Sequence, residues 1–113
     1  MHSKYLHGNV LMVDYTALNA TEAGSVIVIG DKPYIAHSDI PLGELGALAA
    51  VGGVYEVTAG GALAAGDKVG WNPATKKVQA TGLCFGFVCP DESAAADGDV
   101  IRVEHAPDGT TLV

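Results

Sequence analysis

Few residues of this chain have the types and spacing that catalysis needs. A serine nucleophile needs a base and an orienting group, and no serine here lies in a recognisable nucleophile elbow. His37, Ser38 and Asp39 supply the three residue types of a triad, but neighbours in sequence on a strand or loop cannot all converge on one point. These three residues are typical of an exposed polar turn. The sequence therefore predicts no catalytic residue and no enzyme.

Metal and cofactor binding are not indicated by the sequence either. Cys84 and Cys89 differ in position by an odd number, so in a regular strand they point to opposite faces and cannot form a disulfide. Zinc would need two further ligands, and the four histidines have no characteristic spacing. Segment 61–68 resembles a phosphate-binding loop, but Asp67 stands where that loop requires lysine. We expect no metal, no cofactor and two cysteines that act as small buried apolar residues.

The charge of the chain argues against two classes of partner. Six Lys and Arg stand against thirteen Asp and Glu, a formal net charge of −7, and such a surface repels nucleic-acid phosphates and anionic lipids. No segment approaches the roughly 18 to 20 apolar residues of a transmembrane helix. Residues 1–8 lack the apolar core of a secretory signal. We expect no nucleic-acid partner, no membrane partner and a cytoplasmic origin.

The elements that would position any site are indicated by one pattern that occurs three times. Alanine-rich residues, a glycine turn and a strand of β-branched residues follow one another at 22–28, 64–69 and 96–103. β-branched residues suit a pleated, half-buried sheet, and glycine supplies the positive φ of a tight turn. The pattern predicts short strands joined by glycine turns, with Gly66 in the positive-φ region.

Turn signals and apolar runs place the strands of this all-β fold. Strands are expected at 9–14, 25–29, 34–36, 54–57, 68–71, 77–80, 83–89 and 100–105. Residues 25–29 are nearly all β-branched, which predicts a central strand. Residues 44–50 have leucines at helical spacing, but their glycines favour a strand that leads into 54–57. Many short strands in 113 residues indicate a small single-domain β-barrel or β-sandwich of antiparallel strands.

The barrel or sandwich domain is expected to span residues 9–105, between a flexible amino-terminal arm, 1–8, and a carboxyl-terminal tail, 106–113. Tyr5 and Leu6 of the arm have no partners at strand spacing. We therefore expect the arm to be mobile in the free protein and to become ordered against a neighbouring surface.

The central part of the chain resembles a known family. Residues 53–57 read Gly-Val-Tyr-Glu-Val, and after an alanine-rich spacer residues 65–71 read Ala-Gly-Asp-Lys-Val-Gly-Trp. This order is similar to the pattern of the DUF2190 family of phage and prophage capsid cement, or head decoration, proteins. The family pattern also matches the later segments 86–88, 94–99 and 101–103.

The resemblance covers residues 9–103 and implies an all-β domain that binds the outside of an assembled icosahedral head. It implies a homotrimer at positions of threefold or quasi-threefold symmetry, with the major capsid protein as partner. The protein would then be located in the virion and made in the host bacterial cytoplasm. The two cysteines and residues 104–113 lie outside the family pattern, so contacts at the termini cannot be carried over.

Contact residues are predicted from small and apolar side chains. Candidate contacts with the capsid or with other subunits are Tyr5, Leu6, Leu45, Leu48, Val51 and Trp71. The Ala/Gly-rich segment 43–53 is a candidate threefold seam, and a tightly packed inner strand explains it equally well. Trp71 ends a strand, where an aromatic ring plugs a barrel end or, less often, forms a ligand platform. The alternative function is a non-enzymatic β-barrel module that binds a small ligand at the Trp71 rim.

Overall fold

The computed structural model describes residues 2–94 and 96–113, so Met1, expected in the arm, and Ala95, expected in a turn, lie outside the described residues. The described residues form nine strands and no helix. The strands are β1 (Ser3–Thr16), β2 (Val26–Ile29), β3 (Lys32–Ala36), β4 (Leu45–Thr58), β5 (Lys68–Asn72), β6 (Lys77–Gln79), β7 (Gly82–Val88), β8 (Val100–His105) and β9 (Thr111–Leu112). The predicted all-β fold is confirmed, as is the strand interpretation of residues 44–50. No helix that could cross a membrane occurs within the described part of the chain.

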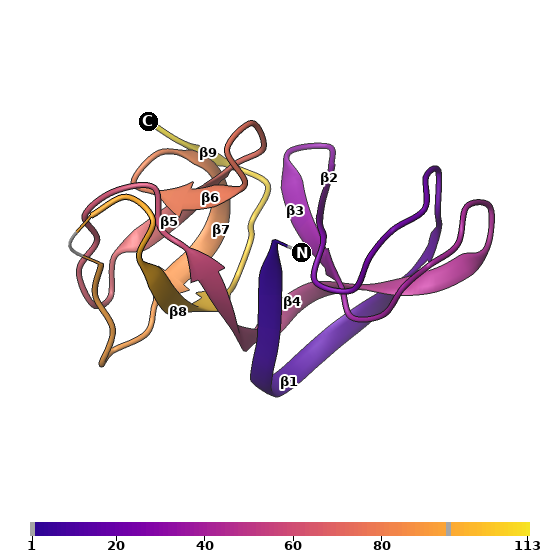
Figure 1. Ribbon diagram of the computed structural model, residues 1–113, viewed down its shortest axis with the longest axis horizontal. Coiled ribbons are helices and arrows are strands. Elements are labelled where there is room, and N and C mark those ends of the chain that lie inside the picture. Colours follow the sequence, from indigo (N-terminus) through magenta and orange to yellow (C-terminus); the bar gives the residue numbers. More distant parts are fainter. Residues whose placement is uncertain (1, 95) are drawn as a thin grey trace.

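The strands form one antiparallel sheet with two distinct regions. The strand order is β2-β3-β4-β8-β7-β5-β6, with β1 paired to β4 and β9 paired to β7. Figure 1 shows β5 to β9 and the end of β4 curled into a half-barrel, from which β1 and the beginning of β4 extend as a two-stranded ribbon. We call the first region the lobe (54–113) and the second the projecting ribbon (9–18 and 42–53). The molecule is accordingly elongated, 40 × 26 × 23 Å.

Alternation of apolar and polar residues builds the lobe. In β8 every second residue, from Ile101 to His105, is buried. In β4 the side chains of Tyr55 and Val57 are 0% and 2% exposed, whereas the residues beside them are partly exposed. A period of two is what a strand with one buried face requires. Tyr55 and Val57 therefore share the buried face of β4.

Two hydrophobic cores of unequal size result from this arrangement. The larger core fills the lobe, where the rings of Trp71 and Phe85 stack with centroids 5.8 Å apart. The smaller core lies under the ribbon and consists of Ala17, Ala36, Ile40 and Leu48. The ribbon therefore rests on far less buried apolar surface than the lobe does, and burial of apolar surface is the main source of stability.

Glycine turns join the strands as the repeated pattern predicts. The turn glycines of the three copies have φ of 86°, 82° and 97°, at Gly24, Gly66 and Gly98. In the second and third copies a carboxylate closes the turn: Asp67 accepts a hydrogen bond from the N–H of Ala64 (2.9 Å), and Asp99 accepts one from Ala96 (3.1 Å). The second and third turns therefore share both a glycine conformation and a side-chain closure.

Three glycines bend the two long strands at the same place. Gly8 of β1 and Gly52 and Gly53 of β4 have φ of 108°, 92° and 87°, and the register of β1 against β4 shifts there. A Cβ atom at Gly52 would overlap the carbonyl oxygen of Asn9, so the close approach of the two backbones requires glycine. The bend turns the upright start of β1 into the ribbon (Figure 1).

Residues 3–8 were expected in a flexible arm, but in the structure they belong to β1. Ser3 is 3% exposed, and Tyr5 lies opposite Tyr55 of β4 in the pairing register. The strand partner of this segment is about fifty residues away, so spacing within the segment could not reveal it. The tail 106–113 is likewise attached to the lobe, because it contains β9, which pairs with β7.

Residues 25–29 were expected as a central strand, but β2 lies at one end of the strand order. Its apolar character reflects burial of its faces, since Val26 is 7% exposed and packs in the larger core. A run of β-branched residues indicates that the two faces of a strand are covered. It does not indicate whether the strand lies in the centre or at the edge of the sheet.

Candidate interaction surface

A cluster of aromatic and imidazole rings lies where β1, β4 and the lobe meet. Nε2 of His37 lies 2.5 Å from the hydroxyl oxygen of Tyr55, and the ring of Tyr5 packs against His37 with centroids 4.6 Å apart. Burial raises the pKa of the Tyr55 hydroxyl and lowers the pKa of His37. Both groups are therefore neutral at pH 7. Their hydrogen bond holds the rings in place and activates no nucleophile.

His105 joins the lobe to the β2–β3 hairpin. Its side chain is 1% exposed, and its Nε2–H donates a hydrogen bond of 2.9 Å to the carbonyl oxygen of Pro33. A carbonyl can only accept, so Nε2 carries the proton of the neutral ring. Burial lowers the pKa of His105 to about 4. Its Nδ1 has no hydrogen-bond partner in the described part of the chain.

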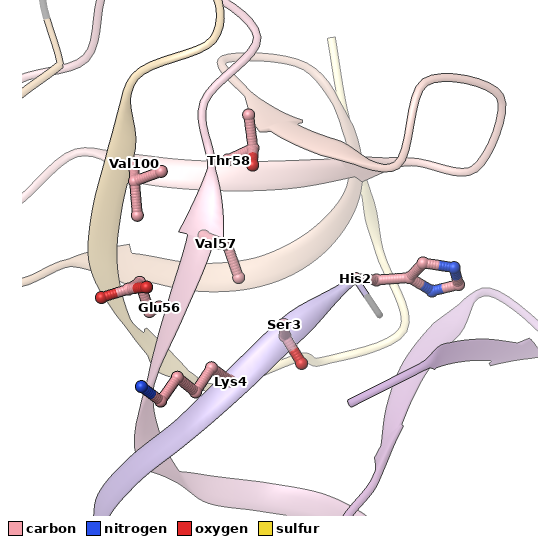
Figure 2. A pocket seen from close by; sticks show the side chains of 7 residues that line it. All are labelled: His2, Ser3, Lys4, Glu56, Val57, Thr58 and Val100. Carbon is pink, nitrogen blue, oxygen red and sulfur yellow. The ribbon is translucent and has the colours of Figure 1, made fainter. Parts of the chain in front are cut away.

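A depression of about 180 Å³ lies between the starts of β1 and β8 and the end of β4. Figure 2 shows Lys4 and Glu56 on its outer side, with the His2 ring directed away from them. Lys4 is opposite Glu56, and Glu56 is opposite Arg102, so charges of alternate sign cover this face. His2 Nδ1 accepts a hydrogen bond from the N–H of Val26 (2.8 Å). These groups stabilise neighbouring strands and form no acid–base pair directed into the depression.

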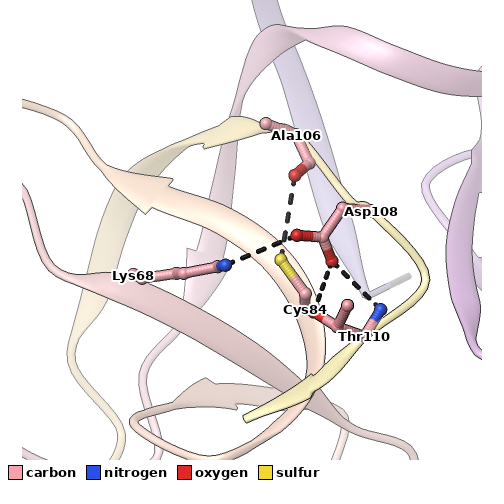
Figure 3. A network of polar contacts seen from close by, with 5 residues as sticks. All are labelled: Lys68, Cys84, Ala106, Asp108 and Thr110. Carbon is pink, nitrogen blue, oxygen red and sulfur yellow. Dashed lines mark hydrogen bonds and ion pairs between the residues drawn. The ribbon is translucent and has the colours of Figure 1, made fainter.

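Polar contacts fasten the carboxyl-terminal segment to the lobe (Figure 3). Asp108 accepts hydrogen bonds from the hydroxyl (2.5 Å) and the N–H (3.0 Å) of Thr110, and it pairs with Lys68 (3.4 Å). The bonds from Thr110 hold the pKa of Asp108 below its ordinary value. The Cys84 thiol lies beneath this segment and donates to the carbonyl oxygen of Ala106, with Sγ and O 3.8 Å apart. These contacts hold the carboxyl-terminal segment against the lobe.

Within residues 2–94 and 96–113, no group of three or more His, Cys, Asp and Glu side chains is placed to hold a metal ion. Cys84 and Cys89 are free thiols, and burial raises the pKa of both. A raised pKa keeps a thiol protonated and unreactive at neutral pH. The described residues thus gather no reactive constellation, and the outer surface is the better candidate for a functional site.

The projecting ribbon exposes large apolar side chains. Its most exposed apolar residues are Leu11, Leu18, Leu42 and Leu45, with exposed fractions of 59%, 77%, 67% and 69%. Leu11 lies opposite Val51, which is 38% exposed, in the pairing of β1 with β4. Exposed leucines add nothing to the stability of the isolated protomer, and a concentration of them marks a contact surface.

The strand β1 also has an unpaired edge. It pairs with β4 from Ser3 to Thr16, and no other strand of the described residues pairs with it; only at its start does the N–H of Ser3 donate to the carbonyl oxygen of Gly24. Most of its residues are exposed. The N–H and C=O groups along such an edge can pair with a strand of another chain. The ribbon therefore offers both apolar side chains and backbone hydrogen-bonding groups to a partner.

The six predicted contact residues fall into two groups. Those at the surface are Tyr5, Leu45 and Val51, exposed by 41%, 69% and 38%, with Leu6 half-buried. Leu48 and Trp71 are 0% and 1% exposed and belong to the two cores, so neither is available to a partner or a ligand. The Trp71 rim therefore gains no support as a ligand platform. Segment 43–53 lies mostly within β4, between β1 and β3, as the inner-strand alternative expects.

Sequence reasoning identified Leu45 but missed two other strongly exposed leucines, Leu18 and Leu42. Leu18 lies two residues after the end of β1 and precedes Asn19, and Leu42 lies between Pro41 and Gly43. Proline, glycine and asparagine mark turns. A leucine flanked by turn-forming residues is expected at the surface of the protomer. This pattern could have identified both Leu18 and Leu42.

Comparison with known proteins gives a family match. A family model described as phage cement protein matches residues 6–105. Comparison with curated proteins gives no match. Among solved structures, the crystal structure of the head fiber gp8.5 N base in bacteriophage phi29 is similar, with 18% sequence identity, coverage of 91% of this chain and 99% of that chain, and a TM-score of 0.49.

Proposed function

Since the chain belongs to the phage cement protein family, we propose that it binds the outer surface of the assembled phage head as a homotrimer and stabilises the shell. It is a structural protein of the phage capsid. In this proposal its partners are the major capsid protein and two further copies of itself, and it catalyses no reaction. It is made in the host bacterial cytoplasm from a phage or prophage gene and then becomes part of the virion.

The exposed surface of the projecting ribbon carries this proposal. A protein whose role is attachment needs apolar area that its own fold leaves uncovered, because burying that area drives association. The ribbon has such area at Leu11, Val51 and Leu45, whereas the lobe buries Trp71 and Phe85 and leaves Phe87 only 39% exposed. The acidic surface, at a formal net charge of −7, suits a protein that must not compete for the packaged genome.

The trimer is supported by the unpaired edge of β1. Strand addition between copies uses different edges of the two partners, and such a head-to-tail contact closes into a ring when the rotation fits. Among the described residues no strand pairs with the outer edge of β2, the first strand in the sheet order, where the N–H of Val26 donates to His2 and the rest of the edge has no strand partner. Pairing of β1 of one protomer with β2 of the next would protect both edges and would close a threefold ring.

Attachment is tested by incubating the purified protein with shells that lack it. We expect the protein to sediment with the shells and to raise the temperature at which they disassemble. Cryo-electron microscopy of the decorated shells should show added density outside the shell at threefold positions. Shells that bind no protein, or that gain no thermal resistance, would contradict the cement function.

The oligomeric state is tested separately by light scattering at tens of micromolar protein. We expect a trimer mass for the wild-type protein and a smaller mass for Leu11→Asp, because the carboxylate enters the contact surface. Val100→Asp is the control, since Val100 is also 59% exposed but lies on the lobe. A monomer mass for the wild-type protein would overturn the trimer and leave attachment to be judged by the shell assay.

A further inference from the structure

The charges of the molecule are distributed unequally between its two regions. Residues 5–31 and 33–67 contain no Lys or Arg. The positive side chains lie at the start of β1, at the β2–β3 turn and in the lobe, at Lys4, Lys32, Lys68, Lys76, Lys77 and Arg102. The charged side chains of the ribbon and of the loops at its end are therefore all carboxylates.

The outer end of the ribbon is built from two loops that lie side by side (Figure 1). We call this end the tip and define it as residues 17–22 and 39–45. The N–H of Ala17 donates to the carbonyl oxygen of Glu44 (3.1 Å), and the N–H of Gly43 donates to the carbonyl oxygen of Ala17 (2.8 Å). Thr21 and Ile40 exchange two further backbone hydrogen bonds. The tip is therefore a hydrogen-bonded unit.

The tip combines exposed leucines with carboxylates. Its leucines are Leu18, Leu42 and Leu45, each more than 65% exposed. Its carboxylates are those of Glu22, Asp39 and Glu44, all on exposed residues. A hollow of about 400 Å³ lies between the two loops and is lined by Ala20, Thr21, Glu22, Asp39, Ile40 and Pro41. Its walls are mostly apolar, with two carboxylates among them.

We propose that the tip is the part of the protein that contacts the capsid, and that its hollow receives a Lys or Arg side chain of the major capsid protein. This assignment rests on the proposed function. Lys and Arg have an apolar stem and a cationic head. In the hollow the stem would lie against Ala20 and Pro41, and the head would lie near Glu22 and Asp39. The surrounding leucines would meet apolar residues of the shell.

Charge decides between the two possible occupants of the tip. If the tips of two copies met, Glu22, Asp39 and Glu44 of one would face the same three carboxylates of the other, and like charges at close range oppose association. A partner surface with basic residues around an apolar area is complementary to the tip in both respects. The tip is therefore assigned to the capsid, and self-association is left to the edge and inner part of the ribbon.

The test compares three variants in shell-binding assays at low and high salt. The apolar tip variant is Leu42→Ser with Leu45→Ser, and the charge variant is Glu22→Gln with Asp39→Asn and Glu44→Gln. The lobe control is Asp91→Asn with Asp97→Asn and Glu104→Gln, all on exposed residues. Asn at position 39 keeps the side-chain oxygen that accepts the hydrogen bond from Ala23. Thermal unfolding of each free variant confirms that the fold is retained.

We expect the charge variant to bind shells about tenfold more weakly at low salt, with a smaller difference at high salt because ions screen the contact. The apolar variant should be weaker by about tenfold at both salt concentrations, since apolar contacts are not screened by ions. The lobe control should bind like the wild-type protein. Tip variants that bind normally, or a control that is equally weakened, would overturn the assignment.

Two further outcomes separate the assignment from the proposals on which it rests. Wild-type protein that fails to bind shells would contradict the cement function itself, before any variant is compared. A tip variant that binds shells normally but has a lower oligomer mass by light scattering would show that a second copy occupies the tip, and this would also overturn the assignment.

Discussion

The lobe and the projecting ribbon are parts of one sheet that use their apolar residues differently. In the lobe, Trp71, Phe85 and Val103 are at most 1% exposed and fill one core. In the ribbon, Leu11 and Leu45 are more than half exposed. The lobe therefore contributes most of the stability of the protomer, whereas the ribbon presents surface that a partner can bury. A substitution should reveal this division by whether it unfolds the whole molecule or only one part.

The largest effect is expected at Gly86, in the interior of the lobe. A Cβ atom there would overlap the carbonyl oxygen of Glu104 on the neighbouring strand. Because the obstructing oxygen is a backbone atom that cannot rotate away, Gly86→Ala should destabilise the protein by about 4 kcal/mol or more in urea unfolding. Gly61→Ala is the matched control, since a Cβ there meets nothing within 4 Å. Equal stability of the two variants would contradict the close packing of the backbone around Gly86.

At the bend, Gly52→Ala should cost about 3 kcal/mol, and its effect should be local. The new Cβ atom would overlap the carbonyl oxygen of Asn9, and φ of 92° adds backbone strain. We expect faster hydrogen exchange in residues 9–16 and 45–52, with the protection of β7 and β8 retained. Equal loss of protection in both regions would show that the ribbon and the lobe unfold as one unit.

The junction of the two regions should make stability depend on pH through His105. Its pKa is about 4 in the folded protein and about 6.5 in an unfolded chain. The unfolded chain therefore binds the proton first as pH falls, so the contribution of the neutral ring is complete above pH 6.5 and is lost towards pH 4. Between pH 7 and pH 4.5 the wild-type protein should lose about 2.5 kcal/mol more than His105→Gln does.

Urea unfolding of both proteins at the two pH values measures this difference. His2 and His37 also have a lowered pKa because of burial. They are present in both proteins, so the comparison removes their own contributions and leaves only the repulsion between His37 and His105. Parallel losses in the two proteins would exclude His105 as the source of the pH dependence.

The smallest effect is expected from a matched pair of turn glycines. Gly66 in the lobe and Gly43 at the tip have φ of 82° and 80°, and a Cβ atom at either meets nothing within 4 Å. Gly66→Val should destabilise the protein by about 1 to 3 kcal/mol through backbone strain. Gly43→Val should cost less, because the tip can relax without disturbing the larger core. Thermal unfolding of the two variants compares them directly. An equal cost would contradict the expectation that the tip relaxes more easily than the lobe.

Most of the strands could be predicted because their signals are local. The hairpin of β5 and β6 follows from Trp71-Asn72-Pro73, and the alternation in β8 is visible in the printed sequence. Pairing between distant segments could not be predicted in this way. Residues 3–8 look unpartnered until β4 is placed beside them, and Leu48 cannot be distinguished from Leu45 until the smaller core is known.

The sequence by itself determined the all-β class, the glycine turns and the resemblance to cement proteins, because each of these depends on residue types within a few positions of one another. The tertiary structure decided which apolar residues face water, where the two long strands bend and which carboxylates gather at the tip. These features depend on contacts between segments far apart in the chain, such as Gly52 with Asn9 and Gly43 with Ala17. Burial is a property of such contacts, so the surface that a partner would meet could be identified only in the folded protein.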